Sequence, residues 1–239
     1  MLRTQFAMLF LCVSDIHGHL DALTAVLATA EKRNFHKLLV AGDICFPGPE
    51  PLETWKRLSA AGAVMVQGVT DRALATLDPS TLRPNSEHEK ARVERMREAR
   101  TELGELILGR LKRLPTHTRI PLEDGGELVL VHGSPADPSE ALTFDMSDDE
   151  LNMMLGDDPA DVVVCGMSHV PFDRMVGGVR IVNVGSVGEA PDQVDGESVP
   201  TDKPSYAHAT WLESTPAGIH VEQITIPLGT PSQKRIRMG

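Results

Sequence analysis

The sequence is poor in aromatic residues and in cysteine. Aromatic residues make up 4% of the 239 positions, so the core must be built from Val, Leu, Ile, Met and Ala. The three cysteines, Cys12, Cys45 and Cys165, have no paired spacing and give no disulfide framework. A reducing compartment fits this pattern, and we expect a cytoplasmic protein.

Positive charge is also scarce: the sequence has 23 Lys and Arg but 34 Asp and Glu, which gives a formal net charge of -11. Such a surface repels phosphate backbones, so broad nucleic-acid binding is not expected. A small phosphorylated substrate stays compatible, because bound cations reverse the local sign of the charge. No apolar stretch reaches the roughly 20 residues that span a membrane, and no membrane partner is expected.

The first half of the chain alternates strand and helix patterns. Apolar runs predict strands at Phe6–Val13, Lys37–Ala41 and Ala63–Val66, and helical spacing predicts helices at Leu20–Arg33 and Glu50–Ala61. We interpret the first run as a core strand rather than a signal peptide, because Ser-Asp follows it at once. Strand–helix units in series predict parallel strands with right-handed crossovers.

The second half begins with a charge-dense stretch, Ser86–Leu114, which predicts one or two amphipathic helices with Ser86 as N-cap and Glu89 as its capping-box partner. Hairpins, further strands and one helix are predicted at Thr118–Leu122 with Glu127–Val131, Phe172–Val176 with Val179–Val182, Asp148–Leu155, Asp161–Cys165, Tyr206–Leu212 and Gly218–Ile226. We therefore expect a parallel half followed by an antiparallel half. A single domain is expected over residues 1–227, with a flexible tail over 228–239.

Five segments share one property, which is that Gly, Asp or His follows directly where a strand ends. They are Ser14–Gly18, Gly42-Asp43, Gly68–Asp71, Val131–Gly133 and Gly166–His169. Ligands bind at the carboxyl ends of strands in open α/β sheets, so these polar groups are candidates to converge. Carboxylate oxygens mixed with imidazole nitrogens suit Mn²⁺, Fe or Zn²⁺.

The order of the segments resembles that of the calcineurin-like metallophosphoesterase superfamily, in particular its small prokaryotic phosphodiesterase branch. The matching segments are Asp15-Ile-His-Gly-His19, Gly42-Asp-Ile-Cys-Phe-Pro-Gly-Pro49, Gly68-Val-Thr-Asp71, His132-Gly-Ser-Pro135, Gly166-Met-Ser-His169 and Asn183-Val-Gly-Ser-Val-Gly188. The resemblance extends over the chain from about Phe6 to Leu212. The resemblance implies an α/β fold, a four-layer α/β/β/α sandwich of two mixed sheets flanked by helices, with two metal ions at its site.

The resemblance also implies which residues bind metal. The first site would consist of Asp15, His17, Asp43 and His169, with Asp43 bridging to a second site that contains His132. Two second-site positions depart from the family pattern, because Val69 stands for an Asn and Met167 for a His. Val69 has no donor atom, and the thioether of Met167 is a poor ligand for hard cations. One ion is therefore expected, and two are left open.

Four residues form the expected catalytic set: His19, Asp43, Thr70 and Arg72. Thr70 replaces a family His or Cys, and a hydroxyl cannot protonate a leaving group at neutral pH. His19 replaces a family Asn and is a candidate substitute ligand or general acid, with capping or packing as the alternative. Arg72 is a candidate for holding a substrate phosphate, with a surface salt bridge as the alternative.

Two functions follow from these residues. The first is metal-dependent hydrolysis of a phosphate mono- or diester, at a site with one intact and one degraded metal position. The alternative is a catalytically inactive binding or scaffold protein with the same fold. A Rossmann-type nucleotide binder is disfavoured because no G-x-G-x-x-G follows the first strand. The substrate is expected to be small and phosphorylated, and a homo-oligomer is left open.

Overall fold

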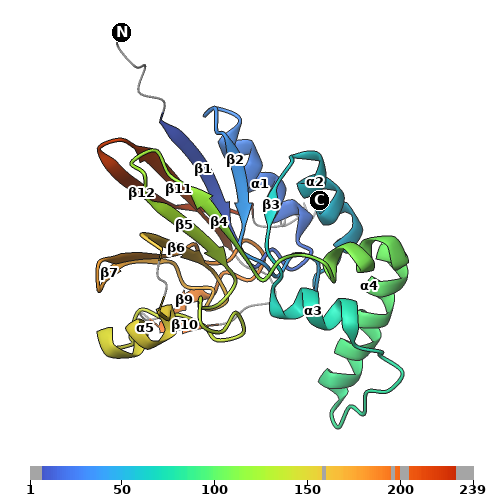
Figure 1. The fold of residues 1–239 in the computed structure, drawn as a ribbon. Helices are drawn as coiled ribbons and strands as arrows, with labels where there is room; N and C mark the ends of the chain where they lie inside the picture. The colour runs from blue at the N-terminus through green and yellow to red at the C-terminus, as the bar shows by residue number, and fades with distance from the viewer. Residues whose placement is uncertain (1–6, 158–159, 195–196, 200–204, 230–239) are drawn as a thin grey trace.

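The computed structural model describes residues 7–157, 160–194, 197–199 and 205–229 (Figure 1). Its first sheet contains β1 (Met8–Val13), β2 (Lys37–Val40), β3 (Val64–Met65), β11 (Tyr206–Thr215) and β12 (Gly218–Pro227), in the order β12-β11-β1-β2-β3. The strands β1, β2 and β3 are parallel, as the strand–helix pattern predicts, whereas β11 and β12 run antiparallel. The sheet is therefore mixed.

The second sheet contains β4 (His117–Pro121), β5 (Glu127–Val131), β6 (Val162–Cys165), β7 (Phe172–Val176) and β8 (Val179–Asn183), in the order β4-β5-β6-β8-β7. Both predicted hairpins are present, but β5, β6 and β8 pair in parallel. The expectation of an antiparallel half is therefore only partly right: both hairpins are antiparallel, but the connection through α5 (Asp148–Leu155) returns the chain so that β6 runs parallel to β5. A short ribbon is formed by β9 (Asp192–Val194) and β10 (Glu197–Val199).

Helices cover the outer face of each sheet. The first sheet is covered by α1 (Leu20–Ala30), α2 (Pro51–Ala60), α3 (Val69–Thr76) and α4 (Glu87–Leu111), and the second by α5. Alternate residues of β1 serve two cores: Leu11 and Val13 pack toward the helices, and Phe10 and Cys12 pack between the sheets. The predicted four-layer α/β/β/α sandwich is confirmed.

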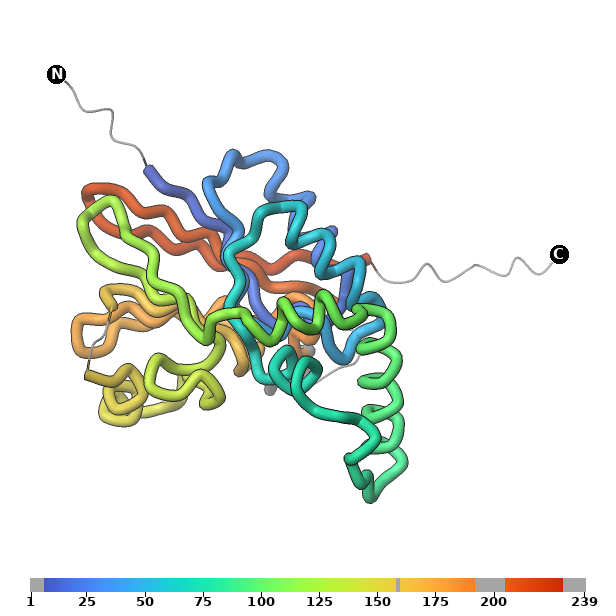
Figure 2. The backbone as a smooth tube through the Cα atoms, turned by 45° about the vertical axis from the view of Figure 1, so that its right-hand side comes forward, coloured from blue at the N-terminus to red at the C-terminus, as the bar shows by residue number. Residues whose placement is uncertain are grey.

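The charge-dense stretch forms α4, whose path is bent (Figure 2). Ser86 Oγ accepts a hydrogen bond from Glu89 N at 3.1 Å, so the predicted N-cap is present. The Glu89 carboxylate accepts from Asn85 N rather than completing the expected capping box. The bend lies at Gly104, whose φ of 68° interrupts the helix.

Within the described part of the chain, no helix combines the length and the apolar character needed to cross a membrane. The three cysteines are buried free thiols, and burial raises the pKa of Cys45. Phe6 and most of the tail expected from residue 228 lie outside the described residues.

Candidate metal centre

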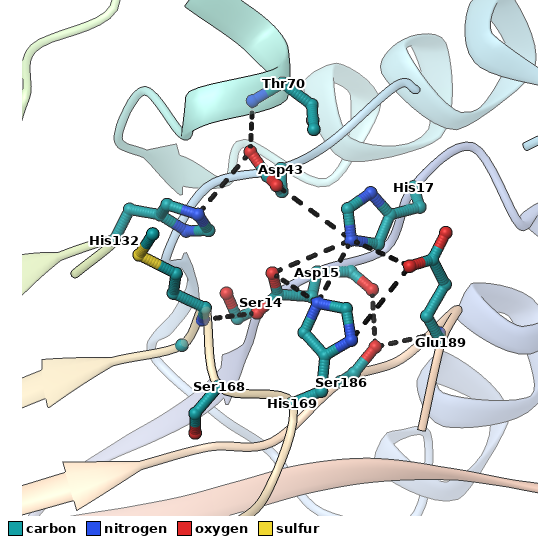
Figure 3. Close-up of polar contacts among 12 residues, drawn as sticks. Ser14, Asp15, His17, Asp43, Thr70, His132, Ser168, His169, Ser186 and Glu189 are labelled. Atoms are coloured by element: carbon teal, nitrogen blue, oxygen red, sulfur yellow. Dashed lines mark hydrogen bonds and ion pairs between the residues drawn. The ribbon is translucent and has the colours of Figure 1, made fainter. Parts of the chain in front are cut away.

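The predicted metal ligands come from four strand ends that meet between the two sheets. Asp15 and His17 follow β1, Asp43 follows β2, His132 follows β5 and His169 follows β6. Figure 3 shows the five side chains turned toward one another. The structure therefore brings together residues that are up to 154 positions apart in the sequence.

The backbone is unusual at these residues. The non-glycine residues with positive φ in the described chain are Asp15 (52°), His17 (53°), Asp43 (53°), Met167 (67°) and His169 (61°). This region is sparsely populated by side-chain-bearing residues, and such strain tends to gather at functional sites. Backbone hydrogen bonds from Asp15 N to Gly42 O at 3.1 Å and from His17 N to Asp43 O at 2.9 Å hold the first two loops together.

Two glycines let the backbone approach the carboxylates closely. A Cβ atom on Gly68 would lie 2.1 Å from Asp43 Oδ1. One on Gly166 would lie 1.9 Å from Ser14 Oγ and 2.4 Å from Asp15 Oδ2. Both distances are far below van der Waals contact, so the two carboxylates can sit where they do only beside glycine.

One half of the cluster, which we call the first half, is formed around His17. Its Nδ1 donates to Phe46 O at 2.6 Å, which leaves Nε2 as the unprotonated atom facing the cluster. His169 Nε2 lies 3.3 Å from this atom, and Asp15 Oδ1 lies 3.7 Å from it. Asp15 Oδ1 is also 3.2 Å from His169 Nε2, so these three donors surround one small space.

The second half is formed by His132 and Asp43. His132 Nδ1 donates to Ala41 O at 2.7 Å, and its Nε2 lies 3.5 Å from Asp43 Oδ1. The other oxygen, Asp43 Oδ2, lies 3.9 Å from His17 Nε2. Asp43 therefore faces both halves with different oxygens, as a bridging carboxylate would.

The cluster fits a divalent cation. Asp15 Oδ1 is fully buried and has no hydrogen-bond partner in the described chain, a costly state for a carboxylate oxygen. Two ligand sets, Asp15 with His17 and His169, and Asp15 with Asp43 and His132, each offer atoms within 4.8 Å of one another. Oxygen and imidazole donors together suit Mn²⁺, Fe or Zn²⁺.

Charges in the cluster shift the pKa values of its members. Burial acts to raise the pKa of Asp15, but the close approach of His169 Nε2 and the charges of His132, His169 and His17 hold it well below its usual range. Burial acts to lower the pKa of His169, but Asp15, Glu189 and Asp43 raise it to about 9. Protons and metal ions therefore compete for the same imidazole.

Asp71 supports the cluster by accepting hydrogen bonds from two loops that carry or contact Asp43. Its Oδ1 accepts from Ile44 N at 2.9 Å and its Oδ2 accepts from Gly68 N at 3.1 Å. Burial and the nearby charge of Asp43 raise the pKa of Asp71 to about 6. Asp71 thus fixes the backbone amides of the two loops that flank Asp43.

The residues at the diverged positions meet the carboxylates through their backbones. Thr70 N donates to Asp43 Oδ1 at 2.8 Å, as Figure 3 shows, and Met167 N donates to Asp15 Oδ2 at 2.9 Å. Thr70 Oγ1 is buried without a hydrogen-bond partner in the described chain. Val69 is 41% exposed at the start of α3. Both loops are thus held against the carboxylates by backbone amides.

The remaining expected site residues lie at the border. His19 is half-buried beside the Gly48 and Gly188 backbones, and burial lowers its pKa. It starts α1 without capping it through its side chain. Arg72 is exposed on α3 and lines a pocket of about 80 Å³ with Val69 and Asp137. Neither side chain forms a hydrogen bond or ion pair with the cluster in the described part of the chain.

One member of the cluster was not expected from the sequence. Glu189 follows the Gly-rich loop after β8, and its Oε2 lies 3.6 Å from His17 Nε2 and 4.0 Å from His169 Nδ1. The signal for it is slight: an acidic residue directly after Gly188, at the end of the last matching segment.

A family model described as "Calcineurin-like phosphoesterase superfamily domain" matches residues 8–202. The chain belongs to this superfamily, and the fold and the ligand cluster agree with that assignment.

Two solved structures are similar in fold. One is a hypothetical protein from Pyrococcus horikoshii, 20% identical, with a TM-score of 0.74 over 93% of this chain and 89% of that chain. Another is a metallophosphoesterase from Sphaerobacter thermophilus, 22% identical, with a TM-score of 0.68 over 92% of this chain and 89% of that chain. No curated protein shows significant similarity to the chain.

Proposed function

We propose that the protein hydrolyses phosphate mono- or diesters with a divalent transition metal held mainly by the first half of the cluster. The observation that carries this proposal is the fully buried Oδ1 of Asp15, which lies 3.7 Å from His17 Nε2 and 3.2 Å from His169 Nε2. A bound divalent cation supplies Lewis acidity and lowers the pKa of water at the site. The natural substrate would be a small phosphorylated compound.

The protein's own groups have separate tasks in this reaction. Asp15, His17 and His169 hold the ion, and the carbonyl of Phe46 fixes the tautomer of His17. Asp43 faces His17 with one oxygen and His132 with the other, so it holds the two halves at a fixed distance from each other. Thr70 keeps Asp43 oriented through its backbone N–H.

The leaving group receives little help from acid catalysis. Thr70 cannot protonate it, and burial lowers the pKa of His19, which disfavours the protonated imidazole that a general acid needs. We therefore expect the enzyme to favour esters whose leaving groups need no proton, such as nitrophenyl phosphates. Alkyl phosphates should react more slowly.

Metal analysis and turnover test this proposal together. The purified protein is loaded with Mn²⁺, its metal content is measured by mass spectrometry, and hydrolysis of nitrophenyl phosphate mono- and diesters is followed. Asp43→Asn should lower turnover by about 100-fold or more, because one bridging carboxylate charge is removed from the cluster. Unchanged turnover in Asp43→Asn would refute the assignment.

A binding or scaffold role is the second candidate, and specific residues favour it. Val69, Thr70 and Met167 leave the second half without the side chains that complete a two-metal site in the family. In this case the Mn²⁺-loaded protein binds the ion but shows no turnover of either ester. Turnover at an ordinary enzymatic rate, on the order of 1 s⁻¹ or faster, excludes the scaffold role.

We infer a cytoplasmic location from the state of the cysteines. Its three cysteines are buried and unpaired, as expected where thiols stay reduced.

A further inference from the structure

Glu189 occupies a position that neither the family pattern nor the sequence motifs assign. It extends from the loop after β8 into the first half of the cluster, as Figure 3 shows. We propose that Glu189 is an additional ligand of the cation bound there; this inference rests on the metal site of the proposed function.

The spacing of the donor atoms supports ligation. Four atoms lie around His17 Nε2: His169 Nε2 at 3.3 Å, Glu189 Oε2 at 3.6 Å, Asp15 Oδ1 at 3.7 Å and Asp43 Oδ2 at 3.9 Å. Neighbouring ligands of one ion lie roughly 3.0–3.5 Å apart when each bond is about 2.1 Å long. Measured from His17 Nε2, Glu189 Oε2 is as near as the oxygens of Asp15 and Asp43. Its contact with His169 is at Nδ1, 4.0 Å away, so the side chain of Glu189 must turn toward Asp15 to join the other ligands on one ion.

The backbone of Glu189 is tied to a metal ligand. Glu189 N donates to Ser186 Oγ at 2.8 Å, and Ser186 Oγ donates to Asp15 O at 2.9 Å. Gly188 N also donates to Asp15 O at 2.9 Å. These bonds fix the start of the Glu189 side chain relative to Asp15, so its approach to His17 is a property of the loop.

The carboxylate of Glu189 lacks a fixed counter-ion. In the described residues its ion-pair partners are His17 and His169, and none is a Lys or Arg. The side chain is 29% exposed, so it is partly removed from water while it faces the imidazoles of His17 and His169. A cation among these groups would neutralise charges that the protein leaves unbalanced.

Glu189 gives the first half an additional carboxylate, whereas Val69 and Met167 give the second half no hard donor. With it, the carboxylates of Asp15 and Glu189 and the imidazoles of His17 and His169 would be available to one ion, and Asp43 Oδ2 lies 3.9 Å from His17 Nε2. A donor set this rich in oxygen favours hard cations such as Mn²⁺ over Zn²⁺, relative to a site richer in imidazole. The single-ion site is then complete without Val69 or Met167.

Calorimetric titration of metal-free protein with Mn²⁺ tests the proposal. Glu189→Gln should weaken Mn²⁺ binding by about 10-fold or more, and Glu189→Asp should weaken it less, because the shorter side chain keeps its charge. Glu94→Gln is the matched control, since Glu94 is exposed on α4 and pairs with Arg97 of the same helix. The control should bind Mn²⁺ within about twofold of the wild type.

Co²⁺ substitution separates ligation from mere positioning. Loss of a ligand lowers the coordination number and intensifies the visible Co²⁺ absorption, so the Glu189→Gln spectrum should change and the Glu94→Gln spectrum should not. Wild-type Mn²⁺ affinity in Glu189→Gln would overturn the proposal. So would weaker affinity with an unchanged Co²⁺ spectrum, because Glu189 would then only position His169.

The readouts are independent of turnover. Tight Mn²⁺ binding that depends on Glu189, together with no ester hydrolysis, would support the ligand and refute the hydrolase. Hydrolysis by the wild type, together with unchanged Mn²⁺ affinity in Glu189→Gln, would support the hydrolase and refute Glu189 as a ligand. If the wild type binds no metal at all, both proposals fail. A thermal melt of each metal-free variant verifies folding, and should Glu189→Gln not fold, the comparison is made on Glu189→Asp.

Discussion

The two halves of the cluster differ in their side chains and agree in their backbones. The first half keeps two imidazoles and Asp15, and Glu189 adds a carboxylate to it. The second half pairs Asp43 with His132, next to Val69 and Met167. In both halves a backbone amide donates to the carboxylate: Met167 N to Asp15 and Thr70 N to Asp43.

The backbone of the site, which we call its frame, and the side chains that act as donors therefore have separate roles. Positive φ angles, close-packed glycines and backbone hydrogen bonds place the carboxylates. The side chains then decide how many cations the frame holds. Three measurements test whether the two halves differ in metal binding and in stability.

The largest expected effect comes from removing one imidazole from each half. His17→Ala should weaken Mn²⁺ binding by about 100-fold or more, because four donors surround its Nε2. His132→Ala should weaken it by less than about 10-fold, because its Nε2 faces Asp43 from the diverged half. Calorimetric titration of both variants gives the ratio, and equal losses would show that the halves do not differ.

Restoring the family side chains should produce the next largest change. The triple change Val69→Asn, Thr70→His and Met167→His should raise the Mn²⁺ content from one ion to two per chain and increase ester turnover. The φ of 67° at position 167 accepts His at least as well as Met. Mass spectrometry of the metal-loaded variant measures the content. A variant that folds and still holds one ion would mean that the frame of the second half has changed as well.

The smallest effect concerns the support of the first half. His208 lies under the Ser186 loop, where its Nδ1 accepts from Ser186 N at 3.4 Å, and burial lowers its pKa to about 4. The folded pKa is below the unfolded value near 6.5, so the unfolded state takes up the proton first. Stability from neutral His208 is therefore present above pH 6.5 and is lost as the pH falls toward 4.

Urea unfolding measures this loss. Between pH 7.5 and pH 5 the wild type should lose about 2 kcal/mol of unfolding free energy relative to His208→Gln, which cannot titrate there. Parallel pH profiles of the two proteins would show that the loop does not depend on a neutral His208.

Much of the fold could be predicted from local patterns. The helix at Asp148–Leu155 and the strand at Glu127–Val131 have the predicted bounds. The short helix α3 was missed, because Val69–Thr76 follows an extended Gly68 and has no side-chain N-cap signal beyond Asp71. The parallel pairs of the second sheet were missed because hairpin signals reveal local turns but not which strands become neighbours.

The candidate site was predictable where a short motif carries the donor. Asp15, His17, Asp43, His132 and His169 each follow a strand, and the structure brings them together. Their role as metal ligands stays a prediction. The sequence could not show that Thr70 meets Asp43 through its amide, because that depends on the backbone path. Glu189 was missed because its approach depends on the Ser186–Asp15 contact, which joins positions far apart in the chain.

The amide of Met167 has a consequence for protein engineering. Its hydrogen bond holds the turn against Asp15 and does not involve the side chain at position 167. Different side chains can therefore be introduced at this position while the turn is kept. An imidazole, an amide or a synthetic chelator introduced there would start from the correct direction without redesign of the loop. Catalysts that hold two unlike metals could be built on this chain by changing one codon at a time.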